Sequence, residues 1–416
     1  MTRRQVLYLA AGGAAALVGL RFGLPYLMRP RTGRRLSDEA LELIERCFEG
    51  IDRTRMLDSH VHLIGLGAGG SGCWIHPKMM SRMHPINRLR YDMFAGALGM
   101  QNDTTADMDY VHRLLALHRQ ANPEGRLLVL GFDQNVDSDG RLRPDYSPFY
   151  TPNEYVLAVA AEHDELIPCP SIHPYRSDAV ARLDAVAAAG ARAIKWLPNA
   201  MGIDPSSSLC ERFYRRMAEL DLPLISHAGR EYAVHTDALQ ELGNPLRLRR
   251  ALDAGVKVVV AHCASLGSMI DLDAEEPGKK ATAFDLFMRM MRDPRYEGRL
   301  FGDISAVTQV NRGVRVVREL LRARDLHPRL INGSDYPVAA LRILFSPTRF
   351  EMGGLLTRSQ RRLCSEIAEI NPLLFDFILK RCLALRDGAG IFRFSPIIFE
   401  SARLFPDPAP DSDGAT

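Results

Sequence analysis

A repeated alternation of apolar strands and helical patterns is the feature that most constrains the fold of this chain. Eight segments are typical of strands, at residues 55–63, 125–134, 165–174, 191–199, 222–229, 257–265, 299–307 and 329–337. Helix-like segments fill every gap between them except the first. Near-continuous apolar strands that alternate with helices indicate a parallel sheet covered on both faces. Eight such units predict an α/β fold of the closed (β/α)8 TIM-barrel type, and a doubly wound open sheet is the alternative.

Residues 244–255 illustrate how the sequence marks the helices. Asn244 suits a helix amino-terminal cap, Pro245 suits the first helical position, and Gly255 suits the residue after the helix. An apolar strand follows at once. We therefore expect a helix between the fifth and sixth strands.

The first gap differs from the others, because residues 76–124 form an insertion between the first and second strands. This insertion is placed to cover the mouth of the barrel. We expect the barrel domain to span residues 51–395, preceded by a linker and lead-in helix at residues 31–50. Residues 396–416 end in the Pro- and Asp-rich sequence FPDPAPDSDGAT and are expected to form a C-terminal tail.

Residues 1–30 have the composition of a signal or membrane anchor. Arg3 and Arg4 precede an apolar run from Val6 to Leu20, and this pair resembles a twin-arginine export signal. The run is short for a membrane-spanning helix, and no clear cleavage site follows it. A removed signal and an uncleaved anchor therefore both remain open. We expect a bacterial protein that is periplasmic, or anchored in the inner membrane and facing the periplasm, with a cytoplasmic protein as the alternative.

Charge and cysteine content argue against several classes of protein. The 416 residues carry a formal net charge of only +3, which does not favour a nucleic-acid partner. The seven cysteines include no CxxC pair, so we expect free, mostly buried thiols rather than a disulfide scaffold or a zinc ribbon. A small-molecule substrate is expected, and the N-terminus is the only expected membrane attachment. Assembly into a homo-oligomer is left open.

Polar side chains occupy the carboxyl ends of the expected strands, where the active sites of parallel barrels lie. They are His60, His62, Lys195, His227, His262 and Asp335. Each alone is compatible with a structural role. Together they would converge on one small volume, and imidazole and carboxylate are ligands that suit zinc and related divalent ions.

The spacing suggests how these residues would share one or two ions. His60 and His62 lie two apart on a strand and so face the same side, where Asp335 can complete the shell of one ion. His227 and His262 can hold a second ion. Lys195 would bridge the two ions if its amine were carbamylated by CO2.

The order of these residues resembles that of the amidohydrolase superfamily of metal-dependent hydrolases. The motifs are DSHVH, AIKWLPN, ISHAG, VVAHCAS and NGSDYP, at the first, fourth, fifth, sixth and eighth strands. The helix-like EINPLLFDFILK resembles the closing helix of the amidohydrolase-related group, and the resemblance covers about residues 57–385. It implies a distorted (β/α)8 barrel with a divalent metal, zinc being the first choice.

The resemblance also implies a mechanism. A metal-activated hydroxide would cleave an amide, ester or lactone bond. Asp335 would accept and pass on a proton, and His262 or a second ion would polarise the carbonyl group. The same superfamily contains decarboxylases, so a lyase acting on a small carboxylic acid is the alternative. Decarboxylating relatives usually lack the fourth-strand lysine, so Lys195 favours hydrolysis.

Three further residues near strand ends are candidates for binding a substrate carboxylate. His173 ends the third strand, Arg176 lies just beyond it, and Arg230 follows the fifth-strand histidine. Arginine suits this role best because its guanidinium group can form two parallel hydrogen bonds. Asp58 is expected to orient one of the ligand histidines.

Overall fold

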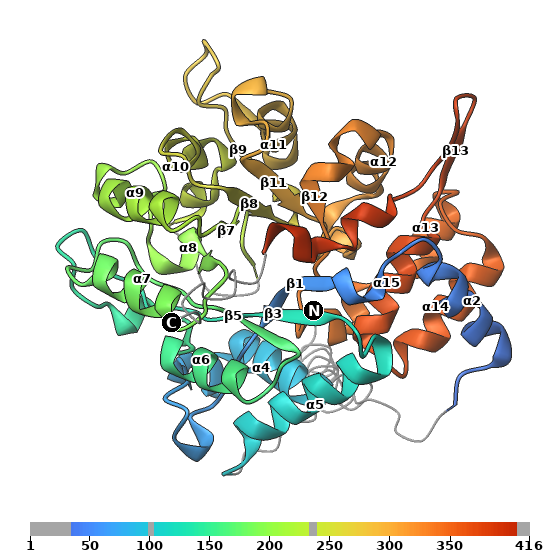
Figure 1. The fold of residues 1–416 in the computed structure, drawn as a ribbon, viewed down its shortest axis with the longest axis horizontal. Coiled ribbons are helices and arrows are strands. Elements are labelled where there is room, and N and C mark those ends of the chain that lie inside the picture. The colour runs from blue at the N-terminus through green and yellow to red at the C-terminus, as the bar shows by residue number, and fades with distance from the viewer. Residues whose placement is uncertain (1–34, 99–103, 233–238, 406–416) are drawn as a thin grey trace, which may run out of the picture.

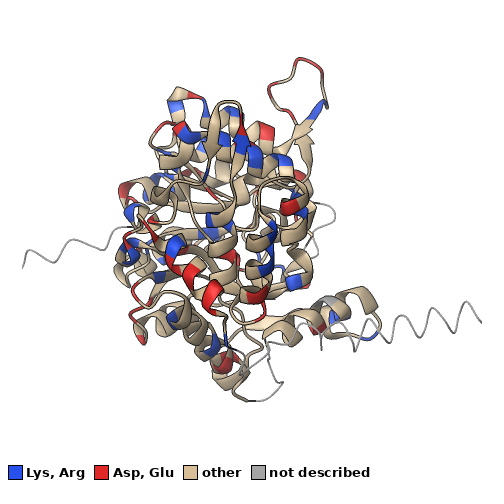
Figure 2. Ribbon diagram, turned by 90° about the vertical axis from the view of Figure 1, so that its right-hand side faces the viewer, with Lys and Arg blue, Asp and Glu red and all other residues tan. Residues whose placement is uncertain are grey.

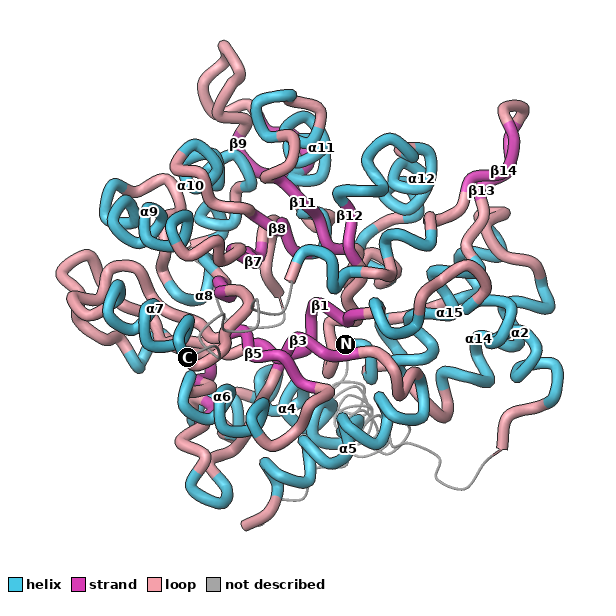
Figure 3. The backbone as a smooth tube through the Cα atoms, in the orientation of Figure 1, coloured by secondary structure: helices cyan, strands magenta, loops and turns pink. Residues whose placement is uncertain are grey.

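The structure is a computed structural model that describes residues 35–98, 104–232 and 239–405. Two parallel sheets lie at its centre with helices around them (Figure 1, Figure 3). The first sheet has the order β1 (Leu57–His62), β3 (Arg126–Leu130), β5 (Leu166–Cys169). The second has the order β12 (Leu330–Ile331), β11 (Leu300–Asp303), β8 (Val258–Ala261), β7 (Leu224–His227), β6 (Ile194–Trp196). The eight expected strands and the α/β class are confirmed.

Backbone hydrogen bonds join the two sheets along both of their edges. At one edge, Lys195 N donates to Pro170 O at 2.8 Å, next to the end of β5. At the other, Ser59 N donates to Asn332 O at 3.0 Å and Asp335 N donates to His60 O at 2.8 Å. Neither edge is paired as a regular ladder, so the closed barrel stays a prediction. The hydrogen bonds nevertheless bring the carboxyl ends of β1, β6 and β12 to the same region.

Helices cover the outer faces of the strands. They include α5 (Ala106–Ala121), α6 (Asn153–Ala161), α7 (Ala179–Ala188), α9 (Glu211–Glu219), α10 (Arg249–Asp253), α11 (Ala283–Met291), α12 (Val314–Arg322) and α15 (Pro372–Cys382). Buried apolar residues fill the space between strands and helices, among them Trp196, Phe213 and Phe287. The expected helix before β8 is confirmed: the Asn244 side chain accepts a hydrogen bond from Leu246 N, and a 3-10 turn leads into α10.

The lead-in helix packs against the C-terminal part of the chain. Helix α2 (Asp38–Phe48) lies beside α14 (Arg358–Ala368) and α15 (Figure 1). Ser37 N donates to Glu366 Oε1 at 2.6 Å. Segments that are far apart in sequence therefore form one side of the described domain.

The expected boundary of the C-terminal tail at residue 396 is wrong. Residues 396–405 form two 3-10 turns, and Leu404 and Phe405 are buried in the same apolar cluster as Leu57 of β1. Asn332 N donates to Ile398 O at 2.9 Å. The apolar side chains of this segment stabilise its packing, and residues 406–416 lie outside the described chain.

The insertion contains α3 (Pro77–Met80), α4 (Pro85–Leu98) and α5, and the short strand β2 (Trp74–Ile75) lies just before it. Strand β2 pairs antiparallel with β4 (Phe149–Tyr150). The glycine-rich residues before β2 wrap around the carboxylate of Asp107, which accepts hydrogen bonds from Leu66 N, Gly67 N and the Ser71 hydroxyl group. A side chain at Gly65 would collide with this carboxylate. The first turn of α5 thus fixes the loop that leads into the insertion.

Helices long and apolar enough to cross a bilayer do not occur within the described ranges. The predicted signal or anchor at residues 1–30 lies outside those ranges. All seven cysteines are free and buried, as expected. Figure 2 shows basic and acidic residues interspersed along the ribbon.

Candidate metal centre and active site

A cavity of about 360 Å³ opens at the carboxyl ends of the strands. Its lining includes all six predicted ligands, which are His60, His62, Lys195, His227, His262 and Asp335. The structure therefore brings together residues that lie far apart in the sequence, from β1 to the segment after β12. The volume lies within the usual range for small-molecule sites, about 300–1,000 Å³.

His60, His62 and Asp335 have the geometry of a metal site. One ligand atom of each lies within 4.8 Å of the others. Asp335 Oδ1 is 3.7 Å from His60 Nε2 and 3.5 Å from His62 Nε2. Ligand atoms of a tetrahedral ion with bonds of about 2.0–2.1 Å lie about 3.3–3.4 Å apart. Asp335 therefore lies close to the distance from each histidine that one shared ion requires.

The hydrogen bonds of His60 direct a nitrogen lone pair toward that position. Its Nδ1 donates to Asp303 Oδ2 at 2.9 Å, so the proton of the neutral ring is on Nδ1. Burial, reinforced by the nearby Lys195 cation, holds the pKa of His60 well below its usual value. His60 is therefore neutral, which is the form that binds metals.

Lys195 also contacts the Nε2 atom of His60. Its Nζ lies 3.0 Å from His60 Nε2 and donates a hydrogen bond to it. The side chain is almost completely buried, and this burial lowers the pKa of its ammonium group. A neutral amine at this position is chemically able to react with CO2, as the sequence-based hypothesis requires.

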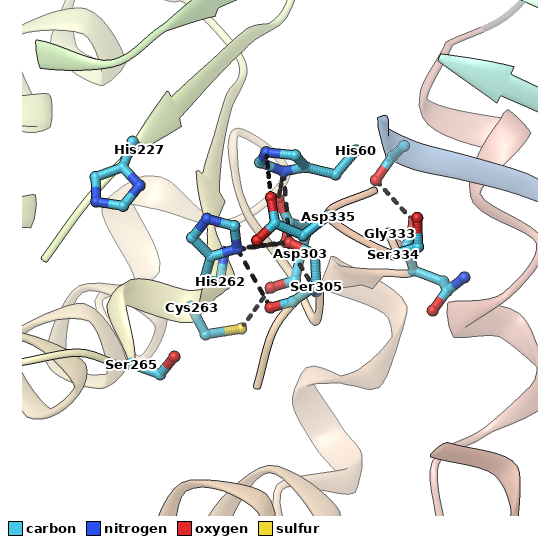
Figure 4. A network of polar contacts seen from close by, with 12 residues as sticks. His60, His227, His262, Cys263, Ser265, Asp303, Ser305, Gly333, Ser334 and Asp335 are labelled. Atoms are coloured by element: carbon cyan, nitrogen blue, oxygen red, sulfur yellow. Dashed lines mark hydrogen bonds and ion pairs between the residues drawn. The ribbon is translucent and has the colours of Figure 1, made fainter. Parts of the chain in front are cut away.

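Asp303, at the end of β11, orients the histidines of the site and was not recognised from the sequence. Its Oδ1 accepts hydrogen bonds from His262 N at 3.0 Å and Ser305 N at 2.9 Å, and its Oδ2 accepts a hydrogen bond from His60 Nδ1 (Figure 4). The signal was an aspartate within an apolar strand, which is costly to bury unless it is paired. Asp58, expected in this role, accepts instead from His60 N and Ser334 N, and so ties β1 to the segment after β12.

Replacing Asp303 with asparagine should weaken metal binding about 10- to 100-fold, as is usual when the partner of a ligand histidine is lost. Asparagine has only one side-chain oxygen, so it cannot accept hydrogen bonds both from His60 Nδ1 and from the His262 and Ser305 backbone amides, and the His60 ring would no longer be fixed. Titration of metal-free protein with zinc measures the effect. Asp293→Asn, on an exposed turn after α11, is a control, and equal affinity of the two variants would contradict the role of Asp303.

His262 and His227 complete the floor of the cavity. His262 Nδ1 lies 2.7 Å from Ser305 Oγ. Because the Ser305 hydroxyl group donates its only proton to Asp303, Nδ1 must be the donor in this pair. Burial keeps the pKa of His262 well below its usual value, so its Nε2 carries a lone pair. This arrangement suits a metal ligand better than a hydrogen-bond donor to a carbonyl oxygen.

The His227 ring lies 5.4 Å from the His262 ring, centroid to centroid. Its Nε2 is buried without a hydrogen-bond partner among the described residues, at 3.6 Å from Glu231 Oε2. No group of three His, Cys or carboxylate ligands within the described ranges includes His227. A second ion at His227 and His262 therefore stays a prediction.

Two of the candidate ligands are held in strained backbone conformations. The φ angles of His262 and Asp335 are +56° and +61°, and Cys263 and Ala264 also have positive φ. Such left-handed conformations are uncommon for residues other than glycine and cluster at functional sites. The hydrogen bonds from His262 N to Asp303 and from Asp335 N to His60 O hold them in place.

The structure corrects two of the three predicted substrate-binding residues. Arg230 lines the cavity, but His173 and Arg176 do not. Both ring nitrogens of His173 bond to backbone groups: Nε2 donates to Met201 O and Nδ1 accepts from Tyr175 N. Arg176 pairs with Asp178 at 3.0 Å. These two residues stabilise the loop after β5 instead.

Arg312 is a cavity residue that the sequence did not reveal. It lies beyond β11 and is only 7% exposed. Its Nη1 donates to Ser265 Oγ at 2.9 Å and its Nε to Gln309 Oε1 at 3.4 Å. None of the ion pairs among the described residues involves Arg312. Burial lowers the pKa of its guanidinium group, and an anionic group of a ligand would compensate for this burial.

Residues 57–347 match the sequence model of a protein family described as amidohydrolase. No curated protein matches the sequence. Among solved structures, the chain is similar to an uncharacterized TIM-barrel protein from Bordetella bronchiseptica, with 14% identity, a TM-score of 0.45, and coverage of 79% of this chain and 99% of that chain. It is also similar to 5-carboxyvanillate decarboxylase from Sphingomonas paucimobilis, with 10% identity, a TM-score of 0.47, and coverage of 85% and 99%. The residues matched by the family include all six predicted ligands.

Proposed function

The chain belongs to the amidohydrolase family, which is part of a superfamily of metal-dependent enzymes. We propose that it is a hydrolase of an amide, ester or lactone bond. The observation that carries this proposal is the convergence of His60, His62 and Asp335 at the base of one cavity. We further propose that the two sheets form a closed (β/α)8 barrel. The hydrogen bonds along both of their edges support this proposal.

His60, His62 and Asp335 would hold the ion, and zinc is our first choice because imidazole and carboxylate are common zinc ligands. When bound, such an ion polarises a carbonyl oxygen and lowers the pKa of water. Asp303 accepts a hydrogen bond from His60 Nδ1 and so orients the ring for this task, while burial keeps the ring neutral. The Asp335 carboxylate, at the cavity surface, would accept a proton from the attacking water and transfer it to the leaving group.

Metal analysis of the purified full chain is the first test. We expect at least one ion per chain, complete loss of ester or lactone hydrolysis after chelation, and recovery when zinc is added back. Protein without metal, or activity that survives chelation, would contradict the proposal. A panel of esters, amides and lactones identifies the bond type.

Lys195→Ala tests whether the lysine supports a second ion. If a carbamylated Lys195 bridges two ions, the variant should retain about one ion per chain and lose most of its activity. Lys257→Ala removes an exposed lysine that pairs with Asp221 and should leave both properties unchanged. A single ion in the wild-type chain, unaffected by Lys195→Ala, would contradict the bridged site.

A decarboxylase acting on a small carboxylic acid is the second candidate. The buried guanidinium of Arg312, which forms no ion pair with a described residue, favours a substrate that carries a carboxylate. Measurement of CO2 release, beside the hydrolysis panel, distinguishes the two reactions.

For residues 1–30 we propose export or membrane anchoring, on the basis of Arg3, Arg4 and the apolar run that follows.

A further inference from the structure

The cavity has two chemically different parts. Its base is polar and contains the candidate metal ligands. Its wall is apolar, and the insertion contributes Met79 from α3 and Tyr91 and Phe94 from α4, next to Ile75 of β2 just before the insertion. Val338 and Leu341, which follow Asp335 in sequence, continue this wall down to the base.

The apolar wall is held in place by packing. Ile75 pairs with Phe149 of β4, and the Phe149 ring stacks on Phe132 with 4.0 Å between ring centroids. Phe94 packs against a buried apolar cluster that contains Leu341 and Tyr336. Because α4 also contacts the turn after Asp335, the wall and the candidate metal site belong to one packed unit.

We propose that the substrate is an ester, amide or lactone that carries a bulky apolar group, either an alkyl chain of about six carbons or more or an aromatic ring. The carbonyl group would lie at the polar base, and the apolar group would contact the insertion. This inference rests on the proposed function, because it places the scissile bond at the metal ligands. Sugars and small, highly charged substrates would leave the wall without a partner and do not fit it.

Chain length is the direct measure of this contact. For p-nitrophenyl esters from acetate to decanoate, kcat/KM should rise about fourfold per methylene until the cavity is filled, since burial of a methylene has about that effect on binding. A flat or falling series would overturn the inference.

A matched pair of variants locates the contact. Met79 lines the cavity, whereas Met83, in the same insertion, is 85% exposed and does not line it. Met79→Gln should lower kcat/KM for decanoate and reduce the decanoate-to-acetate ratio of kcat/KM at least about threefold. Met83→Gln should change neither. Equal effects of the two variants would contradict the assignment of the wall.

A binding assay separates this inference from the proposed function. Butyrate, hexanoate and decanoate are tested for displacement of the dye 1-anilinonaphthalene-8-sulfonate from chelated protein. An affinity that rises with chain length, and that falls for decanoate in Met79→Gln, supports the apolar site. If this is seen but no ester is hydrolysed, the missing hydrolysis counts against the proposed reaction and leaves the apolar site supported. If esters are hydrolysed but neither kcat/KM nor binding depends on chain length, the inference about the apolar group is overturned and the proposed function is not.

Discussion

Replacement of His62 by alanine is expected to remove the bound ion and to lower kcat/KM by about 10³-fold, the usual size for loss of a main electrostatic stabiliser. His62 Nε2 lies 3.5 Å from Asp335 Oδ1, and its Nδ1 has no hydrogen-bond partner among the described residues. The side chain is 19% exposed. Its loss should therefore affect the metal site far more than the stability of the fold.

Metal content, steady-state kinetics and thermal unfolding together test this expectation. We expect substoichiometric metal and severe loss of activity, with a melting temperature close to that of metal-free wild-type protein. His84→Ala is the control, because His84 is an exposed histidine of the insertion that does not line the cavity. Full metal content and wild-type kinetics in His62→Ala would show that the reaction does not use this site.

The α/β class and the strands that carry the candidate ligands could be predicted because their signals are local. Apolar strands of parallel sheets are evident in the sequence, and polar residues at their carboxyl ends stand out against that background. Such strands contain His60, His62, Lys195 and His227, while His262 follows β8 directly and Asp335 lies a short distance beyond β12. Parallel strands then bring these ends together, whatever the sequence distance between them.

Features that depend on partners distant in sequence could not be predicted. His173 has the same strand-end position as the ligands, but Met201 O, 28 residues away, accepts its Nε2 proton. Arg312 reaches the cavity from a loop, where side-chain direction has no period in the sequence. The role of Asp303 depends on its contact with His60, 243 residues away.

The C-terminal boundary failed for a related reason. Residues 396–405 have no helical or strand period, yet Leu404 and Phe405 are buried against the strands. Apolar residues in a segment without a helical or strand period do not show from the sequence alone whether they are buried, because the residues that they would pack against are not known. Sequence patterns identify regular elements well and identify irregular, buried segments poorly.

Substitution of Asp376 by alanine should lower the free energy of unfolding by about 3–5 kcal/mol, the usual cost of removing one partner of a buried ion pair. Asp376 Oδ2 accepts a hydrogen bond from Lys380 Nζ at 2.5 Å within α15, and both side chains are at most 1% exposed. The alanine variant would leave the Lys380 cation buried without its carboxylate. Urea unfolding measures the change.

Lys380 also connects α15 to the segment that carries a candidate ligand. Its Nζ donates to Gly333 O at 2.7 Å and to Asn332 Oδ1 at 3.2 Å, just before Asp335. The double variant Asp376→Leu/Lys380→Met removes both charges, so it should be more stable than either single variant. Its activity should nevertheless stay low, because Gly333 loses its hydrogen-bond donor. If the double variant recovered activity together with stability, Lys380 would serve only to pair with Asp376 and would not position Asp335.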